Sequence, residues 1–206
     1  MKVIINLSNH HIHLSQNDLE QLFGKGYKLQ KLANLMQPGQ FAAEETVDIR
    51  GTKGEIKKMR ILGPIRSQTQ CEIMLGDAWH LGVETPHIRL SGDLKGSSPF
   101  TIIGPKGTIE KKEGLIIAKR HIHLDEKTAK KWKVEKGQEV SIRAGLESRN
   151  IVFEDVIIRV NEKFVPECHI DFDEGNAAGI KNGDIGEVLL KKAGKQGVCE
   201  ICFAKT

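Results

Sequence analysis

One short motif occurs twice in this sequence of 206 residues: His-Ile-His-Leu stands at residues 11–14 and again at residues 121–124. On an extended strand, side chains two positions apart point to the same face, so the two histidines of each copy project together. Neutral imidazole is a common ligand of zinc and similar ions. A single His-x-His is more typical of surface or core packing, but two matched copies favour metal binding and predict two related halves.

Each copy of the motif leads into a predicted helix. Ser15 and Asp125 directly follow the copies and are residue types favoured at helix N-caps. Residues 16–23 and 126–132 then carry apolar side chains at helical intervals. The repeated unit is therefore a strand with a metal-facing pair, a cap and a short helix.

Alternating apolar and polar residues predict short strands along most of the remaining chain. A Gly-x-Lys-Gly turn also occurs twice, at residues 51–54 after the first histidine motif and at residues 104–107 before the second. This reversed order suggests that the halves exchange strands. We expect a mainly β fold with short helices: two related β-barrel domains, residues 1–95 and 96–206, each capped by a short α-helix, with the metal site between them.

The composition narrows the class of partner. Hydrophobic residues at 39% and charged residues at 28% are ordinary for a globular protein. Aromatic residues at 5% argue against a nucleic-acid platform of stacked rings, and the formal charge of +4 suits an anionic small molecule. No signal peptide or apolar run of membrane length is seen. We expect a cytoplasmic protein with small-molecule substrates and without a nucleic-acid or membrane partner.

Four cysteines, Cys71, Cys168, Cys199 and Cys202, are too few and too irregularly spaced for a secreted disulfide framework. They indicate a reducing compartment. Cys199 and Cys202 have the spacing of a metal or redox pair, but they lie in an alternating apolar run that predicts a last strand. We interpret them as structural.

Two further residues extend the candidate ligand set: Glu72, on a predicted strand, and His169, at a predicted strand end. With the four repeated histidines, they could hold two ions where the halves meet, with Glu72 bridging and positions left open for substrate. His80 and His87 lie in looser contexts, and we expect them to be solvated.

Longer motifs surround these residues: Ser8-Asn9, Gln-Pro-Gly-Gln-Phe-Ala-Ala-Glu-Glu-Thr at residues 37–46, Arg-x-Leu-Gly-Pro-x-Arg-Ser-Gln-Thr-Gln at residues 60–70, Ser-Gly-Asp-Leu at residues 91–94 and Arg-His-Ile-His at residues 120–123. Together they resemble the PduL-type phosphate acyltransferases. The resemblance implies a two-barrel fold and a dinuclear zinc centre. It also implies reversible exchange between a short acyl-CoA, acetyl or propanoyl, plus phosphate and the acyl phosphate plus coenzyme A, in acetate metabolism or propanediol degradation.

Carried over residue by residue, the resemblance implies one zinc held by His11, His13 and Glu72 and another held by His121, His123 and His169. Arg66 matches the phosphate-binding arginine and is the candidate catalytic residue, since a planar guanidinium suits phosphate. Coenzyme A contacts are implied for Ser8, Asn9, Lys53, Arg60 and Asn176. Without the resemblance, Lys53 and Arg60 would be interpreted as part of a solvated basic face.

The sequence departs from the family at position 10, where His stands in place of the usual Arg. We also see no amphipathic N-terminal extension of the kind that targets members to bacterial microcompartments. Two alternatives stay open: a dinuclear metallohydrolase that acts on a thioester or phosphate ester, and a binding or structural module whose histidines only join the barrels. A requirement for phosphate would distinguish the acyltransferase from the metallohydrolase. Catalytic turnover would distinguish it from the binding or structural module. A homo-oligomer is also left open.

Overall fold

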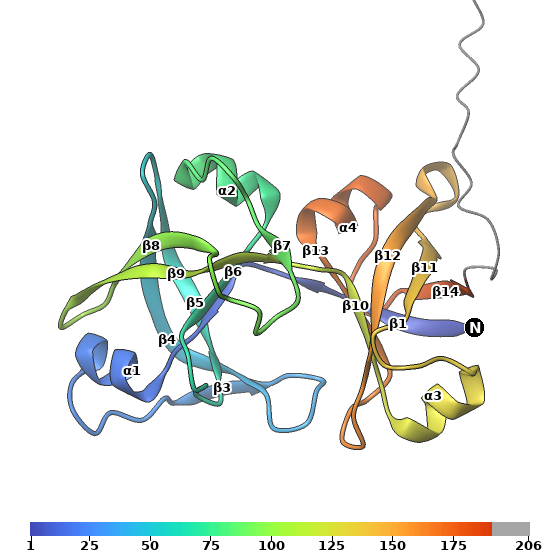
Figure 1. Ribbon diagram of the computed structural model, residues 1–206, viewed down its shortest axis with the longest axis horizontal. Coiled ribbons are helices and arrows are strands. Elements are labelled where there is room, and N and C mark those ends of the chain that lie inside the picture. The colour runs from blue at the N-terminus through green and yellow to red at the C-terminus, as the bar shows by residue number, and fades with distance from the viewer. Residues whose placement is uncertain (191–206) are drawn as a thin grey trace, which may run out of the picture.

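Alternation of apolar and polar residues along the strands produces a mainly β architecture of two closed barrels, which lie side by side (Figure 1). The structure is a computed structural model, and it describes residues 1–190. The strand predicted around Cys199 and Cys202 lies outside the described residues. The predicted mainly β fold of two barrels with short helices is confirmed.

The first barrel closes through strands β4, β5, β2, β6, β9 and β8, with β8 pairing back to β4. The short strand β3 extends the sheet beyond β4, and β7 pairs with the end of β9. The elements of this barrel are β2 (His11–His13), α1 (Gln16–Phe23), β3 (Lys31–Asn34), β4 (Phe41–Arg50), β5 (Glu55–Gly63), β6 (Gln70–Ile73), α2 (Leu75–Leu81), β7 (Ile88–Arg89), β8 (Ser98–Ile103) and β9 (Thr108–Ala118).

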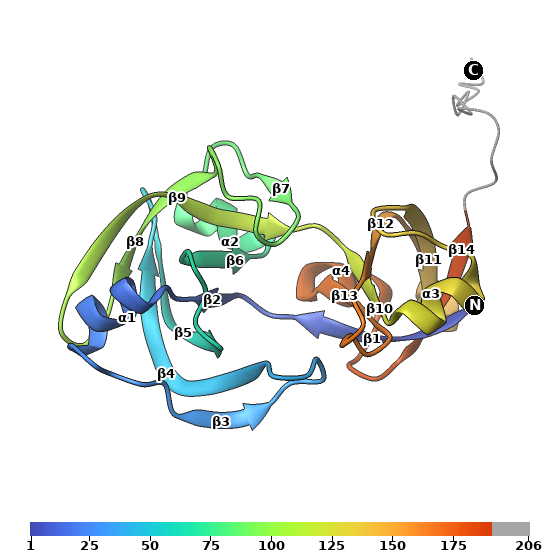
Figure 2. The ribbon, with the colours of Figure 1, turned by 60° about the horizontal axis from the view of Figure 1, so that its bottom comes forward.

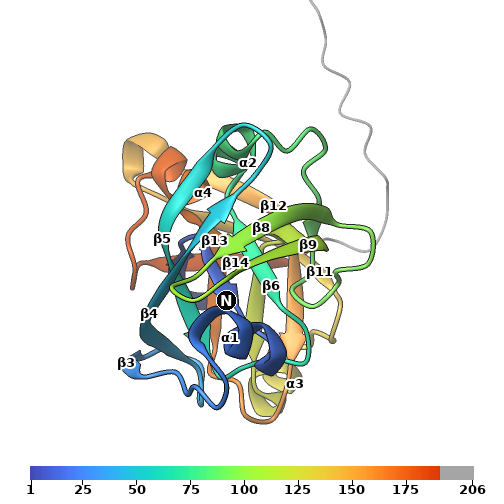
Figure 3. The same cartoon turned by 90° about the vertical axis from the view of Figure 1, so that its left-hand side faces the viewer.

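The second barrel closes through strands β1, β13, β10, β12, β11 and β14. Figure 3 views the molecule from the side of the first barrel, with the second barrel behind it. The elements of this barrel are β1 (Lys2–Ser8), β10 (His121–Leu124), α3 (Glu126–Trp132), β11 (Glu139–Ala144), a 3₁₀ turn (Glu147–Arg149), β12 (Ile151–Val160), β13 (Glu167–Asp171), α4 (Phe172–Ala178) and β14 (Ile185–Leu190).

The two barrels share one arrangement around the histidine strands. Strand β2 lies between a parallel neighbour, β5, and an antiparallel neighbour, β6. Strand β10 likewise lies between parallel β12 and antiparallel β13. Helices α1 and α3 follow the histidine strands, and α2 and α4 follow the antiparallel neighbours. The repeated motif therefore marks two related halves, as expected.

The barrels exchange strands at two places. The chain runs from β1 directly into β2, yet β1 pairs with β13 and β14 of the second barrel. It also runs from β9 into β10, yet β9 pairs with β6 and β8 of the first barrel. Figure 2 shows both crossings between the barrels. Sheet membership therefore does not follow the division into residues 1–95 and 96–206, because residues 98–118 close the first barrel; the division as domains stays a prediction.

The predicted helices begin and end where their caps indicate. The Ser15 hydroxyl accepts a hydrogen bond from the Asp18 amide at 3.2 Å, and the Asp125 carboxylate accepts one from the Thr128 amide at 2.9 Å. Helix α4 was not predicted, because it is short and contains Gly and Asn. Strand β3 was not predicted, because no alternation of apolar and polar residues marks it; all of its residues are exposed.

Each barrel encloses its own apolar core. Ile12 and Ile122, which separate the paired histidines, are both fully buried, one in each core. Burying such a side chain contributes about 1.5–3 kcal/mol. Because neighbours along a strand point to opposite faces, this burial aims the histidines of each pair away from the core.

A fragment of residues 1–95 would lack β8 and β9, so the first barrel could not close and β1 would lose its partners. We expect this fragment to show no cooperative thermal transition by circular dichroism. A matched fragment of residues 1–190, which keeps every described strand, should unfold cooperatively. A cooperative transition in the shorter fragment would contradict the strand exchange.

Candidate metal centre and active site

The third ligand of each set comes from the same register position in the two barrels. His11 lies opposite Glu72 across the β2 and β6 pair, and His121 lies opposite His169 across the β10 and β13 pair. Within each set, one ligand atom per residue lies within 4.8 Å of the others. The structure therefore brings together all six side chains that the sequence predicted, as two sets of three, although their roles as ligands stay predictions.

Backbone carbonyls set the orientation of the first histidine in each pair. His11 Nδ1 lies 2.8 Å from the Asn9 carbonyl oxygen, and His121 Nδ1 lies 2.9 Å from that of Lys119. A carbonyl oxygen only accepts, so Nδ1 carries the proton in both rings. The Nε2 lone pair is then free for a metal ion, which is the usual arrangement of a ligating histidine.

The second histidine in each pair has a buried nitrogen without a partner. Among the buried side-chain atoms of residues 1–190, the Nδ1 atoms of His13 and His123 make no hydrogen bond. A buried polar atom without a partner costs free energy, and native proteins rarely keep one. Since both orphans occur at the same position of the repeat and face two further ligand atoms, these residues fit a bound cation.

Burial keeps these rings neutral and able to bind metal. Burial, His11 and Arg66 lower the pKa of His13 to about 2. Burial, His169 and Arg159 lower the pKa of His123 to about 3. At neutral pH both lone pairs are therefore available, and no proton competes for them.

Glu72 connects the two ligand sets electrostatically. Burial acts to raise its pKa, but His11, a hydrogen bond from Ser91 and the Arg66 charge outweigh burial and lower it. His121 of the other set also lowers it, so the two sets lie within electrostatic range of each other. Gln70 donates a further hydrogen bond to this carboxylate. Glu72 is therefore ionised between the two barrels.

His169 is oriented by Glu167, a residue for which the sequence indicated no role. His169 Nε2 lies 2.9 Å from the Glu167 carboxylate, which leaves Nδ1 for a ligand. Burial acts to raise the pKa of Glu167, but hydrogen bonds from His169, Asn6 and Gln37 outweigh it and lower that pKa to about 2. Gln37 comes from the loop between β3 and β4, so Glu167 also ties the barrels together.

Arg66, the candidate phosphate-binding residue, lies near the first ligand set, and its role stays a prediction. Its amide donates to the Leu14 carbonyl at 2.9 Å, and its guanidinium donates to the Ser91 hydroxyl at 3.1 Å. The side chain is half-buried, and its charge acts on both His13 and Glu72. Arg66 thus presents a guanidinium beside the buried ligands.

The residues predicted to contact coenzyme A do not all lie near the histidines. Ser8 and Asn9 occupy the crossing from β1 to β2, and Arg60 lies beside His11 but donates to the carbonyls of Ala43 and Glu44. Asn176 is exposed on α4. Lys53 lies in the turn before β5, where its amide donates to the Leu81 carbonyl at 3.1 Å. Among the described residues, no contact joins Lys53 to either ligand set.

His10, at the position where the family resemblance implies arginine, hydrogen-bonds to a carboxylate instead. Its Nδ1 lies 3.1 Å from the Asp77 carboxylate at the start of α2. This contact holds α2 against the crossing between the barrels.

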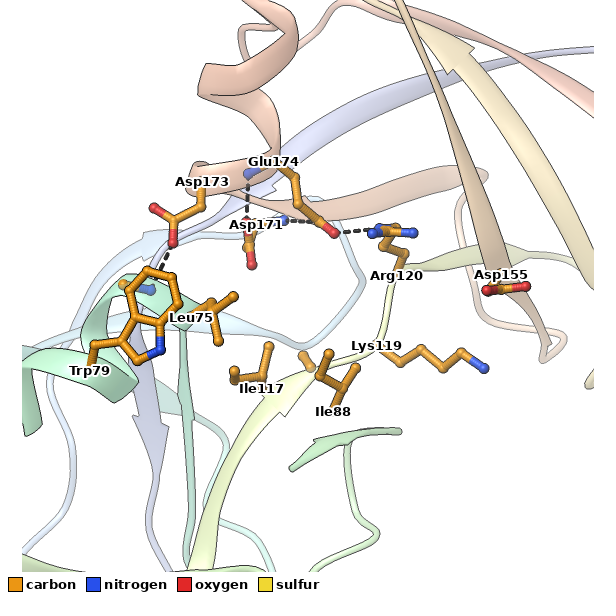
Figure 4. Close-up of a pocket in the computed structure, with 12 residues that line it drawn as sticks. Leu75, Trp79, Ile88, Ile117, Lys119, Arg120, Asp155, Asp171, Asp173 and Glu174 are labelled. Atoms are coloured by element: carbon orange, nitrogen blue, oxygen red, sulfur yellow. Dashed lines mark hydrogen bonds and ion pairs between the residues drawn. The ribbon is translucent and has the colours of Figure 1, made fainter. Parts of the chain in front are cut away.

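A cleft of about 690 Å³ lies between α2 and α4 at the crossing from β9 to β10 (Figure 4). Trp79, which is 69% exposed, and Leu75 form one wall of it. Asp171, Asp173 and Glu174 add carboxylates to the lining, and Lys119 and Arg120 add cations. None of the predicted metal, phosphate or coenzyme A residues lines this cleft.

Sequence reasoning assigned no role to Gln70, Ser91, Arg159 and Glu167. Gln70 and Ser91 stand inside the motifs of residues 60–70 and 91–94, but a motif does not show which atoms meet. Arg159 and Glu167 lie on strands whose alternation was visible, so they could have been placed on the face of the histidines had the register been known.

Comparison with known proteins identifies the family. A sequence profile of the phosphate propanoyltransferase family matches residues 4–181. The phosphate propanoyltransferase of Thermotoga maritima is 49% identical over 183 residues, which cover 89% of this chain and 87% of that protein. The phosphate propanoyltransferase of Priestia megaterium is 52% identical over 184 residues, which cover 89% of this chain and 84% of that protein. The phosphate propanoyltransferase of Rhodopseudomonas palustris is 46% identical over 190 residues, which cover 92% of this chain and 83% of that protein.

The chain therefore belongs to the phosphate propanoyltransferase family, and the resemblance carried by its motifs is confirmed. Membership makes it a transferase and supports phosphate acyltransferase activity. None of the described helices is long and apolar enough to cross a membrane.

Replacing His123 by Ala removes one lone pair from the second ligand set. We expect the metal affinity of that set to fall by more than the roughly 10- to 100-fold that outer-shell partners contribute. Metal content after dialysis against a weak chelator measures this loss. His80→Ala, at an exposed ring outside both sets, is the matched control. Equal metal content in the two variants would exclude His123 as a ligand.

Proposed function

We propose that this protein reversibly converts acetyl-CoA or propanoyl-CoA plus phosphate to the acyl phosphate plus coenzyme A, with one zinc ion in each ligand set. The observation that carries this proposal is the matched pair of orphaned nitrogens, on His13 and His123, in a member of the phosphate propanoyltransferase family. They support one cation in each half of the repeat.

The donor set favours zinc. Imidazole nitrogens with one carboxylate oxygen are typical zinc ligands, and three protein ligands leave a position open for substrate. When bound there, zinc supplies Lewis acidity toward a thioester carbonyl and a phosphate oxygen. Glu72 is the candidate bridge, because it belongs to the first set and its pKa is also lowered by His121 of the second set.

The residues of the chain place phosphate against the thioester. The Arg66 guanidinium, held by the Ser91 hydroxyl, presents a planar fork to phosphate oxygens. A phosphate oxygen then forms a bond to the thioester carbonyl carbon, the carbon–sulfur bond breaks, and the coenzyme A thiolate leaves and takes up a proton. Five of the six ligand side chains are buried, so little water competes with phosphate for the acyl group.

Ser8, Asn9, Arg60 and Asn176 remain the proposed coenzyme A contacts. The first three lie along the crossing into β2 and on its neighbour β5, which supports a binding path that leads to the first ligand set. Lys53 also stays a proposed coenzyme A contact; it lies in the turn before β5, where its amide hydrogen-bonds to Leu81.

We also propose a cytoplasmic location. Cys71 and Cys168 are buried and unpaired, as is usual in a reducing compartment. A homo-oligomer stays a prediction.

The defining experiment measures thiol release from acetyl-CoA and propanoyl-CoA by zinc-loaded protein, with and without inorganic phosphate, while acyl phosphate is assayed directly. We expect release that requires phosphate and forms acyl phosphate in equal amount. Release without phosphate would indicate the alternative metallohydrolase. No release with either substrate would leave only a binding module.

Removing the Arg66 guanidinium should chiefly impair the use of phosphate. A hydrogen bond to a charged group contributes about 1.5–3 kcal/mol, so Arg66→Ala should raise the KM for phosphate by roughly ten- to hundredfold. Arg50→Ala is the control, because Arg50 is exposed and paired with Glu55. A KM for phosphate that matches the control would refute the assignment.

A further inference from the structure

A second arginine, Arg159, lies beside the second ligand set. Strand β12 runs parallel to β10, and Arg159 is the direct register partner of His123. Val156 and Ile158 belong to the core of the second barrel, so alternation along the strand turns Arg159 away from that core. The guanidinium therefore lies on the face that carries His121 and His123.

An aromatic ring links Arg159 to this ligand set. The guanidinium carbon lies 6.0 Å from the centroid of the Phe164 ring, and that ring lies 4.4 Å from the His123 ring. Stacking on an aromatic face holds a guanidinium in place without using its N–H donors. Arg159 is therefore positioned with its hydrogen-bonding capacity unused.

Arg159 differs from every other arginine of the chain, all of which lie in the described residues. Each of the others either hydrogen-bonds to a carboxylate, a hydroxyl or a backbone carbonyl or forms an ion pair with a carboxylate: Arg50, Arg60, Arg66, Arg89, Arg120, Arg143 and Arg149. Within residues 1–190, the Arg159 guanidinium makes no hydrogen bond or ion pair, and it lies over the Phe164 ring. It is also half-buried, and a partly desolvated cation without a hydrogen-bond partner is unfavourable unless a ligand supplies one.

The charge of Arg159 acts on both barrels. It lowers the pKa of His121 and His123 in its own barrel and that of Arg66 in the other. Burial lowers the pKa of Arg159 itself, and Glu72 opposes this. Two half-buried guanidinium groups from opposite barrels thus repel each other and share Glu72 as their nearby carboxylate.

We propose that Arg159 is a second phosphate-binding residue, which holds the phosphate dianion or the phosphoryl group of the acyl phosphate from the side of the second barrel while Arg66 holds it from the first. A dianion relieves the repulsion between the two cations, and each planar fork can donate two hydrogen bonds to it. This proposal rests on the proposed function for its substrate. Its geometry rests on the register of Arg159, its stacking on Phe164 and its lack of any other partner.

The variant Arg159→Gln tests the proposal in the zinc-loaded enzyme. Loss of a charge-assisted contact predicts a KM for phosphate raised by about tenfold or more, with the KM for acetyl-CoA and the metal content unchanged. Arg159→Met keeps an apolar stem against Phe164, and it should show the same shift if the Gln variant folds poorly. Arg143→Gln, at an exposed arginine paired with Glu187, is the matched control.

Three results would overturn the proposal. The KM for phosphate in the folded variant could equal that of the control. The KM for acetyl-CoA could rise as much as that for phosphate, which would place Arg159 at the phosphates of coenzyme A. The metal content could fall together with the thermal midpoint, which would make Arg159 a structural support of the ligand set.

Calorimetric titration with inorganic phosphate provides a readout that does not depend on turnover. Metal-loaded wild-type protein should bind phosphate about tenfold or more tightly than the Arg159→Gln protein. If the wild-type protein forms no acyl phosphate, the proposed function fails, but this titration still decides the role of Arg159. Equal affinity for phosphate in the two proteins, or no phosphate binding by the wild-type protein, would overturn the proposed role of Arg159.

Discussion

The buried nitrogens of His13 and His123 impose the constraint on which the rest of the site depends. An imidazole nitrogen without a partner is unfavourable in a closely packed interior, yet both rings are held there by strands whose other face forms a barrel core. Hydrogen bonds around the other rings fix the tautomer that leaves one imidazole nitrogen free to bind a metal ion. The Asn9 carbonyl oxygen holds the proton of His11 on Nδ1, and Glu167 holds the proton of His169 on Nε2.

The repeat explains why the third candidate ligand of each set lies at the same position beside its histidine strand. The two residues at this position nevertheless differ in type. Glu72 and His169 occupy the same place beside β2 and β10, but the first set carries a carboxylate and the second carries three imidazole rings. A divalent ion bound to the all-histidine set would keep more of its positive charge than one bound beside Glu72. Such an ion would attract an anionic substrate more strongly to the second barrel, the barrel that contributes Arg159.

Strand exchange makes this site a property of the whole molecule. Strands β1 and β9 cross between the barrels immediately before the two histidine strands, so the crossings hold the two ligand sets close to each other. Gln37 and Glu167 add a hydrogen-bonded link across the same gap. A movement of one barrel against the other would separate Glu72 from the second set.

The sequence by itself determined the histidine pairs, the caps at Ser15 and Asp125 and the family, because these depend on spacing and residue type over a few positions. Only the tertiary structure decided which strands closed each barrel, since pairing between distant segments has no local signature. The same reason explains Arg159 and Glu167. Their roles depend on the register of β12 and β13 beside β10, and a strand pattern shows which residues share a face but not which strand lies next to it.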